Sequence, residues 1–210
     1  MEPTMRKREF AARTSAVVVG TLLLTGLAGA AAAEEVGSDD VDVKVEIAEI
    51  EGPGVLAMSV GGTSTTLTET GSTELVRQFT GTLPTVTVTD TRAAEDIPAD
   101  IGWYVLGSST DFVGDAGQAP IGAEYLGWIP ALIDGGESGL VAEGDPVDTA
   151  IDGGEDGVGL VDQELLALAI DSGAIASEGQ WTANANLFLR TPATVAPGSY
   201  SSTLTLSLFE

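Results

Sequence analysis

The sequence of 210 residues contains no cysteine and no histidine. Without cysteine, the chain can form neither disulfides nor thiolate metal sites. Without histidine, it lacks the commonest general base and the commonest zinc ligand. No serine lies in a Gly-x-Ser-x-Gly elbow, and the glycine-rich stretches lack the Lys-Ser/Thr ending of a phosphate-binding loop. We therefore expect that the protein is not an enzyme.

Positive charge is also scarce, with eight Lys and Arg residues against 32 Asp and Glu residues. Half of the basic residues lie before residue 14, ahead of an apolar stretch at 15–30 and the small residues Ala31–Ala33. A basic head, an apolar segment and an Ala-x-Ala exit are typical of a cleavable signal peptide. The apolar segment of about 16 residues is shorter than the roughly 20 that cross a bilayer. We expect residues 1–33 to be a signal peptide and the protein to be secreted, extracellular or associated with a cell wall.

Residues 34–210 retain four basic and 30 acidic residues, a net charge of −26. This charge disfavours nucleic acid and anionic lipid as partners. The sequence leaves open whether the acidity serves a cationic partner or reflects a salt-adapted source. No other stretch is long and apolar enough to cross a membrane, so residues 34–210 are expected to form one domain without a membrane span.

Alternating apolar and polar residues dominate this domain and predict strands. The expected strands are at 41–47, 55–60, 63–70, 74–92, 102–106, 125–133, 186–190 and 200–209, and the first three are expected to form a β-meander. Residues 134–159, rich in Gly, Asp and Glu, are expected to form an exposed loop or a long hairpin. One short helix is predicted at 162–170, between an Asp162 N-cap and a stop at Gly173. The predicted fold class is therefore all-β, an antiparallel β-sandwich or barrel-like domain with at most one short helix.

Several side chains are candidates for binding. Asp90 and Arg92 would share one face of a strand, either as a clamp on a ligand or, as we favour, as an internal ion pair. Among the three tryptophans, Trp103 and Trp128 have apolar neighbours that favour core positions. Trp181 lies in a polar run and is expected to be exposed, where an indole could stack on a sugar ring. Residues 152–157 offer oxygen ligands for calcium, but their spacing does not match that of an EF-hand. We therefore expect no cofactor, and calcium bound by this loop is the alternative.

Two segments resemble the WxL family of bacterial cell-surface domains. The first runs from Thr87-Val88-Thr89-Asp90-Thr91-Arg92 through a short loop to Gly102-Trp103-Tyr104-Val105. The second is the terminal Tyr200–Leu208 segment. The resemblance covers about 74–210. Val105 replaces the leucine of the first motif, and Leu206-Ser207-Leu208 lacks the tryptophan of the second.

The resemblance implies a protein held non-covalently, without an anchor of its own, on the peptidoglycan of a Gram-positive cell wall or on other surface proteins. Two alternatives remain open: a self-assembling subunit of a surface fibre or layer, and a secreted carbohydrate-binding module. Tyr200, just after a Pro-Gly turn, is also typical of a tyrosine corner. The residues predicted to take part in binding are Asp90, Arg92, Trp103, Val105, Trp181, Leu206 and Leu208.

Overall fold

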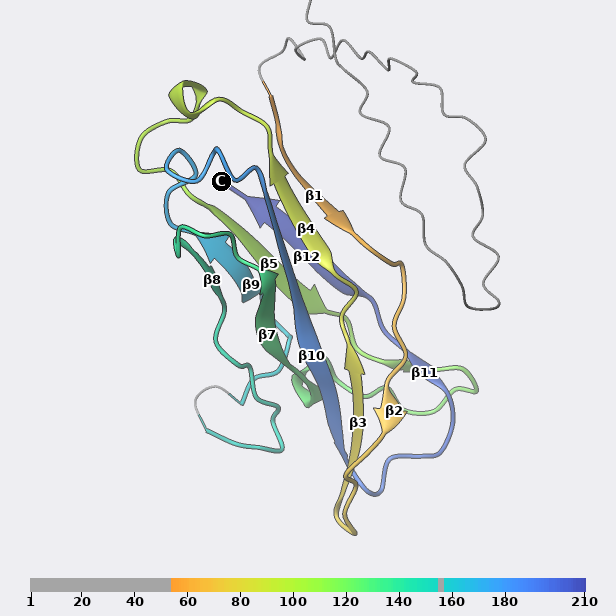
Figure 1. Ribbon diagram of the computed structural model, residues 1–210. Helices are drawn as coiled ribbons and strands as arrows, with labels where there is room; N and C mark the ends of the chain where they lie inside the picture. Colours follow the sequence, from red (N-terminus) through yellow and green to blue (C-terminus); the bar gives the residue numbers. More distant parts are fainter. Residues whose placement is uncertain (1–53, 155–156) are drawn as a thin grey trace, which may run out of the picture. The chain divides into compact units, whose positions relative to one another are not determined.

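The computed structural model describes residues 54–154 and 157–210, which belong to one compact unit, Glu49–Glu210. The predicted signal peptide and the predicted strand at 41–47 lie outside the described residues. The unit is built from antiparallel strands in three sheets (Figure 1). Two further elements are 3-10 helices of three residues, η1 (Ala94–Asp96) and η2 (Ala123–Tyr125). The all-β prediction is therefore confirmed.

The largest sheet has six strands and curls into a half-barrel. Its path is β1 (Leu56–Val60), β4 (Val86–Asp90), β10 (Gln180–Pro192), β3 (Val76–Thr82) and β2 (Thr68–Glu69), and β7 (Leu126–Asp134) pairs with β10. The strand β10 is 13 residues long and joins the sheet together. Its first part pairs with β4 and its second part with β3, while β7 runs along its other edge.

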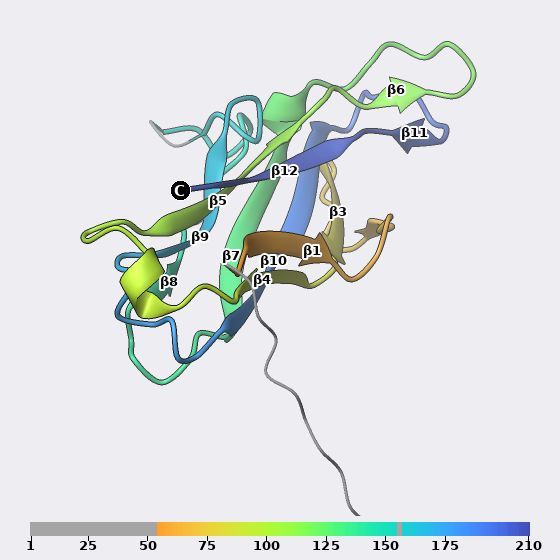
Figure 2. The same cartoon turned by 90° about the horizontal axis from the view of Figure 1, so that it is seen from above.

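The second sheet has four strands in the order β12 (Leu204–Phe209), β5 (Trp103–Ser109), β9 (Glu164–Ala169) and β8 (Val141–Glu143). Seen from above, β5 and β12 lie on one side of the unit and β1 and β4 on the other (Figure 2). A small third sheet consists of β11 (Tyr200–Ser201) and β6 (Val113–Gly114). Among the described residues, no helix is long and apolar enough to pass through a membrane.

The helix predicted at 162–170 is wrong, because these residues form β9. Leu and Ala favour helices weakly, and tertiary contacts override such a preference. Here β9 is an inner strand that pairs with β5 on one edge and β8 on the other. Leu166 and Ala169 are buried in the core from this position. After the strand, Asp171 Oδ1 accepts a hydrogen bond from the backbone N–H of Ala174, so the chain turns instead of continuing a helix.

The predicted β-meander is also wrong. The strand at 55–60 exists as β1, but it pairs with β4, with Met58 opposite Val88. In the threonine-rich run only Thr68–Glu69 forms a strand, and it pairs with β3. Period-two alternation identifies a strand and its buried face, but it does not say which strand lies alongside.

The space between the two sheets is filled by the three tryptophans and by aliphatic side chains. Trp128 of β7 is fully buried below Gly107 of β5, where a Cβ atom would lie 2.6 Å from the indole ring. Glycine at 107 therefore lets the two sheets approach each other closely. Val86 and Val88 of β4 are buried on one face, as their alternation predicts.

The predicted strands near the C-terminus exist, but they belong to different sheets. After β10 the chain crosses through β11 to β12 in the second sheet. The Tyr200 hydroxyl donates a hydrogen bond of 2.8 Å to the Ala196 carbonyl oxygen, which is the contact of a tyrosine corner. The segment at 134–159 is more structured than predicted, because it contains β8 and buries Val147 and Thr149.

Candidate functional site

The two segments that carry the WxL resemblance lie side by side. Strands β5 and β12 are about a hundred residues apart in the sequence and pair in antiparallel register along their length. Val105 lies opposite Leu208, and Tyr104 lies opposite Phe209. Among the described strands, β12 is the outermost strand of its sheet and pairs with β5 alone. The fold thus brings the predicted residues Trp103, Val105, Leu206 and Leu208 into one neighbourhood.

Strand alternation divides this neighbourhood between two faces. Trp103 and Val105 point into the core and are each 1% exposed. Leu206 and Leu208 are partly buried and pack against the same core. These residues are therefore structural members of the sandwich, and a ligand on the surface would contact the other face.

The other face carries an aromatic pair that the sequence reasoning missed. Tyr104 is 40% exposed and stacks on Phe209, with ring centroids 5.2 Å apart and planes 12° from parallel. The signal was available for Tyr104, because a residue between two buried strand residues must point outward. For Phe209 the sequence gave no such signal, since its pairing with Tyr104 depends on the register between β5 and β12.

An ion-pair network lies at the end of β12. Arg92 donates hydrogen bonds from Nε and from its backbone N–H to Asp90 Oδ1, at 2.8 and 3.1 Å, and from a terminal nitrogen to Asp90 Oδ2 at 2.6 Å. Its other terminal nitrogen contacts a carboxylate oxygen of Glu210 at 2.5 Å. The internal pair favoured by the sequence is observed, and it ties the end of β4 to the end of β12.

Burial and charge pairing act in opposite directions on Asp90. Burial of its side chain raises the pKa of Asp90, but the hydrogen bonds from Arg92 more than offset this and leave the pKa below its usual value. The hydrogen bonds that Arg92 donates to the Asp90 carboxylate raise the pKa of Arg92 further above its already high value. Both carboxylate oxygens of Asp90 and most donors of Arg92 are already engaged, so the pair holds the structure in place and offers few groups to a ligand.

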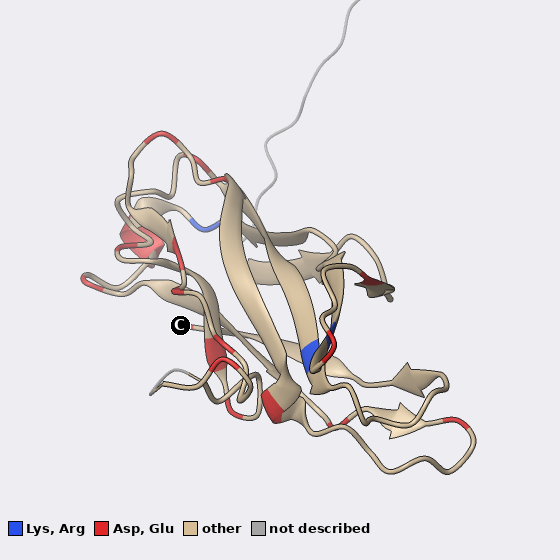
Figure 3. Ribbon diagram, turned by 90° about the horizontal axis from the view of Figure 1, so that it is seen from below, with Lys and Arg blue, Asp and Glu red and all other residues tan. Residues whose placement is uncertain are grey.

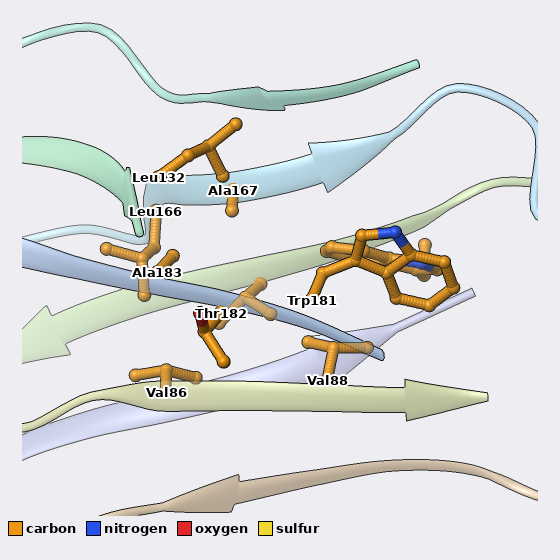
Figure 4. Close-up of a pocket in the computed structure, with 10 residues that line it drawn as sticks. Val86, Val88, Leu132, Leu166, Ala167, Trp181, Thr182 and Ala183 are labelled. Atoms are coloured by element: carbon orange, nitrogen blue, oxygen red, sulfur yellow. The ribbon is translucent and has the colours of Figure 1, made fainter. Parts of the chain in front are cut away.

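The prediction that Trp181 is exposed is wrong. Its side chain is 2% exposed and packs against Trp103, with ring centroids 5.5 Å apart. Trp181 begins the inward face of β10, and its polar sequence neighbours lie on the outward face or in the preceding turn. Figure 4 shows it beside Val86 and Val88, at a cavity of about 10 Å³, which is at most the space of one water.

The indole N–H of Trp181 donates a hydrogen bond of 2.8 Å to Glu178 Oε2, and this bond lowers the pKa of Glu178. The other oxygen of Glu178 accepts hydrogen bonds from the backbone N–H groups of Glu137 and Ser138. Trp181 therefore anchors the turn that follows β7, and a stacked sugar cannot reach it.

The loop considered for calcium uses its first acid internally. Asp152 accepts hydrogen bonds from the backbone N–H and the hydroxyl of Thr149, and it forms an ion pair with Arg190. Glu155 and Asp156 lie outside the described residues. Within the residues that are described, no group of three or more acidic side chains is arranged around a metal position.

Acidic residues are concentrated in the loops and turns, and the long strands carry few charges (Figure 3). The aromatic pair of β5 and β12, with Tyr104 40% exposed and Phe209 half-buried, offers an apolar surface next to the polar Arg92–Glu210 contact. Such a combination can stack on the apolar face of a sugar ring or pack against a protein side chain. The chain matches no family model, no curated protein and no solved structure.

Proposed function

We propose that this chain is an exported, non-enzymatic surface protein of WxL type, which binds non-covalently to the peptidoglycan of a bacterial cell wall or to a surface complex on it. The contact surface in this proposal is the outward face of β5 and β12. The observation that carries the proposal is the stack of the exposed Tyr104 on the half-buried Phe209, which lies where the two WxL-like segments pair.

Because the chain is acidic, specific wall binding can be distinguished from adsorption driven by charge. The net charge of −26 on residues 34–210 opposes attachment to anionic wall polymers, and salt would screen that repulsion. Attachment through aromatic stacking depends little on salt. We expect the exported chain to sediment with purified cell walls at both low and high salt, and a failure at both would contradict wall binding.

Two variants locate the contact. Tyr104→Ala removes half of the stack and should abolish most of the retention. Ile133→Ala is the matched control, because Ile133 is a similarly exposed side chain (54% against 40%) on β7 of the other sheet. Equal retention of both variants would place the wall contact elsewhere.

A second candidate is a subunit that assembles through strand edges into a fibre or layer. It is favoured by the outer edge of β12, which no described strand covers and which carries no charged residue between Leu204 and Phe209. Natural edge strands usually carry charges that prevent pairing with another chain. Light scattering distinguishes the candidates, since assembly predicts a mass that rises with concentration and wall binding predicts a constant one.

A further inference from the structure

A hollow lies on the outward face of the large sheet and is lined mainly by residues of β3, β10 and β7. These three strands run side by side (Figure 1). Its volume is about 450 Å³, within the range of roughly 300–1,000 Å³ typical of small-molecule sites. This face is turned away from the core and belongs to a different sheet from the Tyr104–Phe209 surface.

The strand register sets the floor of the hollow. Asn186 of β10 lies between Thr82 of β3 and Ile129 of β7. Two residues further along β10, Phe188 lies between Thr80 and Gly127. A Cβ atom at residue 127 would lie 2.5 Å from the Phe188 ring, so glycine is what lets this ring lie flat across the strand.

The polar side chains of the floor are available to a ligand. In the part of the chain that the structure describes, the side chains of Thr80, Thr82 and Asn186 and the carboxylate of Asp148 make no hydrogen bond within the protein. Together they offer hydroxyl, amide and carboxylate groups, both donors and acceptors. Ile129 adds an apolar surface and is 46% exposed.

The charges of the hollow do not favour an anion. Its cation, Arg190, lies 4.7 Å above the Phe188 ring centroid, contacts Asp152 and donates a hydrogen bond of 2.7 Å to Gln78. The remaining charge is the carboxylate of Asp148. A phosphate or an acidic ligand would therefore meet a free negative charge and an already paired positive one.

We propose that this hollow is a binding site for a saccharide without negative charge. Sugar hydroxyls both donate and accept hydrogen bonds, which suits Thr80, Thr82, Asn186 and Asp148. The apolar face of a sugar ring can pack against the half-exposed side chain of Ile129, which removes apolar surface from water. This assignment is independent of the proposed wall association, because it concerns another sheet and a soluble ligand.

The test is a titration of the isotope-labelled exported chain with oligosaccharides, in which the NMR chemical shifts of its backbone amides are monitored. Four probes are used at millimolar concentration, the range of weak single-site binding: cellotetraose, maltotetraose, mannotetraose and the tetramer of N-acetylglucosamine. We expect at least one probe to give saturable shifts at Thr80, Thr82, Ile129 and Asn186. Shifts absent for all four probes, or confined to Tyr104 and Phe209, would overturn the assignment.

Paired variants separate binding from folding. Asn186→Ala removes a hydrogen-bonding group and should weaken binding about fivefold. Asn184→Ala changes the same residue type on the same face of β10, two positions outside the hollow, and should leave binding unchanged. Ile129→Ala and Ile133→Ala form a second such pair on β7. Equal affinities within both pairs would overturn the assignment, even if sugar binding were observed.

Discussion

The two faces of β5 differ in exposure: one face packs in the core, and the other lies on the surface. Trp103 and Val105 point inward and are almost fully buried, whereas Tyr104 between them points outward and is 40% exposed. The residues that carry the family resemblance are thus the ones that hold the sandwich together. The surface that a partner could contact is formed by the residue between them and by its cross-strand neighbour Phe209.

The neighbouring strands extend this division. On β12, Leu208 packs toward the core opposite Val105, while Phe209 stacks on Tyr104. Beyond the end of β4, the Asp90–Arg92 pair links to Glu210 at the end of β12. Inward residues and the ion pair should therefore control stability, and the outward aromatic pair should control binding.

The largest expected effect comes from Trp103→Ala. Removing a fully buried indole leaves a cavity among Val105, Trp181 and their neighbours, and such changes lower the free energy of unfolding by about 3–5 kcal/mol. Urea denaturation monitored by circular dichroism measures the loss. Tyr104→Ala is the control on the same strand and should cost only about 1–2 kcal/mol, since it loses the contact with Phe209 but leaves no cavity in the core. Similar losses for both would contradict the division between the faces.

An intermediate effect is expected from Asp90→Asn. The buried carboxylate accepts all its hydrogen bonds from Arg92, and losing the charge should lower stability at neutral pH by about 2–3 kcal/mol. The pKa of Asp90 is lower in the folded than in the unfolded chain. Its stabilisation is therefore fully present above the unfolded pKa of about 3.9 and is lost as the pH falls through the lower, folded pKa.

Denaturation curves between neutral and strongly acidic pH check this prediction. The difference in stability between the original chain and Asp90→Asn should shrink as the pH falls below that window. Glu69→Gln is the comparison. Glu69 and Arg77 form an exposed ion pair, so this substitution should lower the free energy of unfolding by less than Asp90→Asn does. A pH-independent difference for Asp90→Asn would mean that the amide disturbs packing and that charge is not the cause.

Sequence reasoning succeeded where the cause is local. Period-two alternation at 86–90 predicts both the strand and its inward residues, because neighbouring side chains of a strand point to opposite faces. The apolar neighbours of Trp103 likewise favour its core position. It failed where the cause is tertiary. Residues 164–169 have helical composition, but strands on both edges fix them as β9. Trp181 has polar neighbours in sequence, but the face of β10 on which it lies is covered by the second sheet.

In the candidate sites, too, local features could be predicted from the sequence and tertiary ones could not. Burial of Trp103 and the Asp90–Arg92 pair could be predicted from short segments. The Tyr104–Phe209 stack joins two strands about a hundred residues apart, and the hollow joins Thr80, Ile129 and Asn186 from three strands. Such surfaces are set by strand order and register, which a single sequence does not contain.

The smallest effect, and the most specific one, is the coupling between Tyr104 and Phe209. Stacked aromatic pairs contribute about 0.5–1.5 kcal/mol beyond the area they bury. A double-mutant cycle with Tyr104→Ala and Phe209→Ala, measured by urea denaturation, should give a coupling energy in that range. Ser108 and Thr205 occupy another cross-strand pair of β5 and β12, and a cycle there should give a smaller value. If the aromatic pair showed no coupling, its rings would not be held together in solution. The outward face of β5 would then lack the rigid platform on which the proposed wall contact depends.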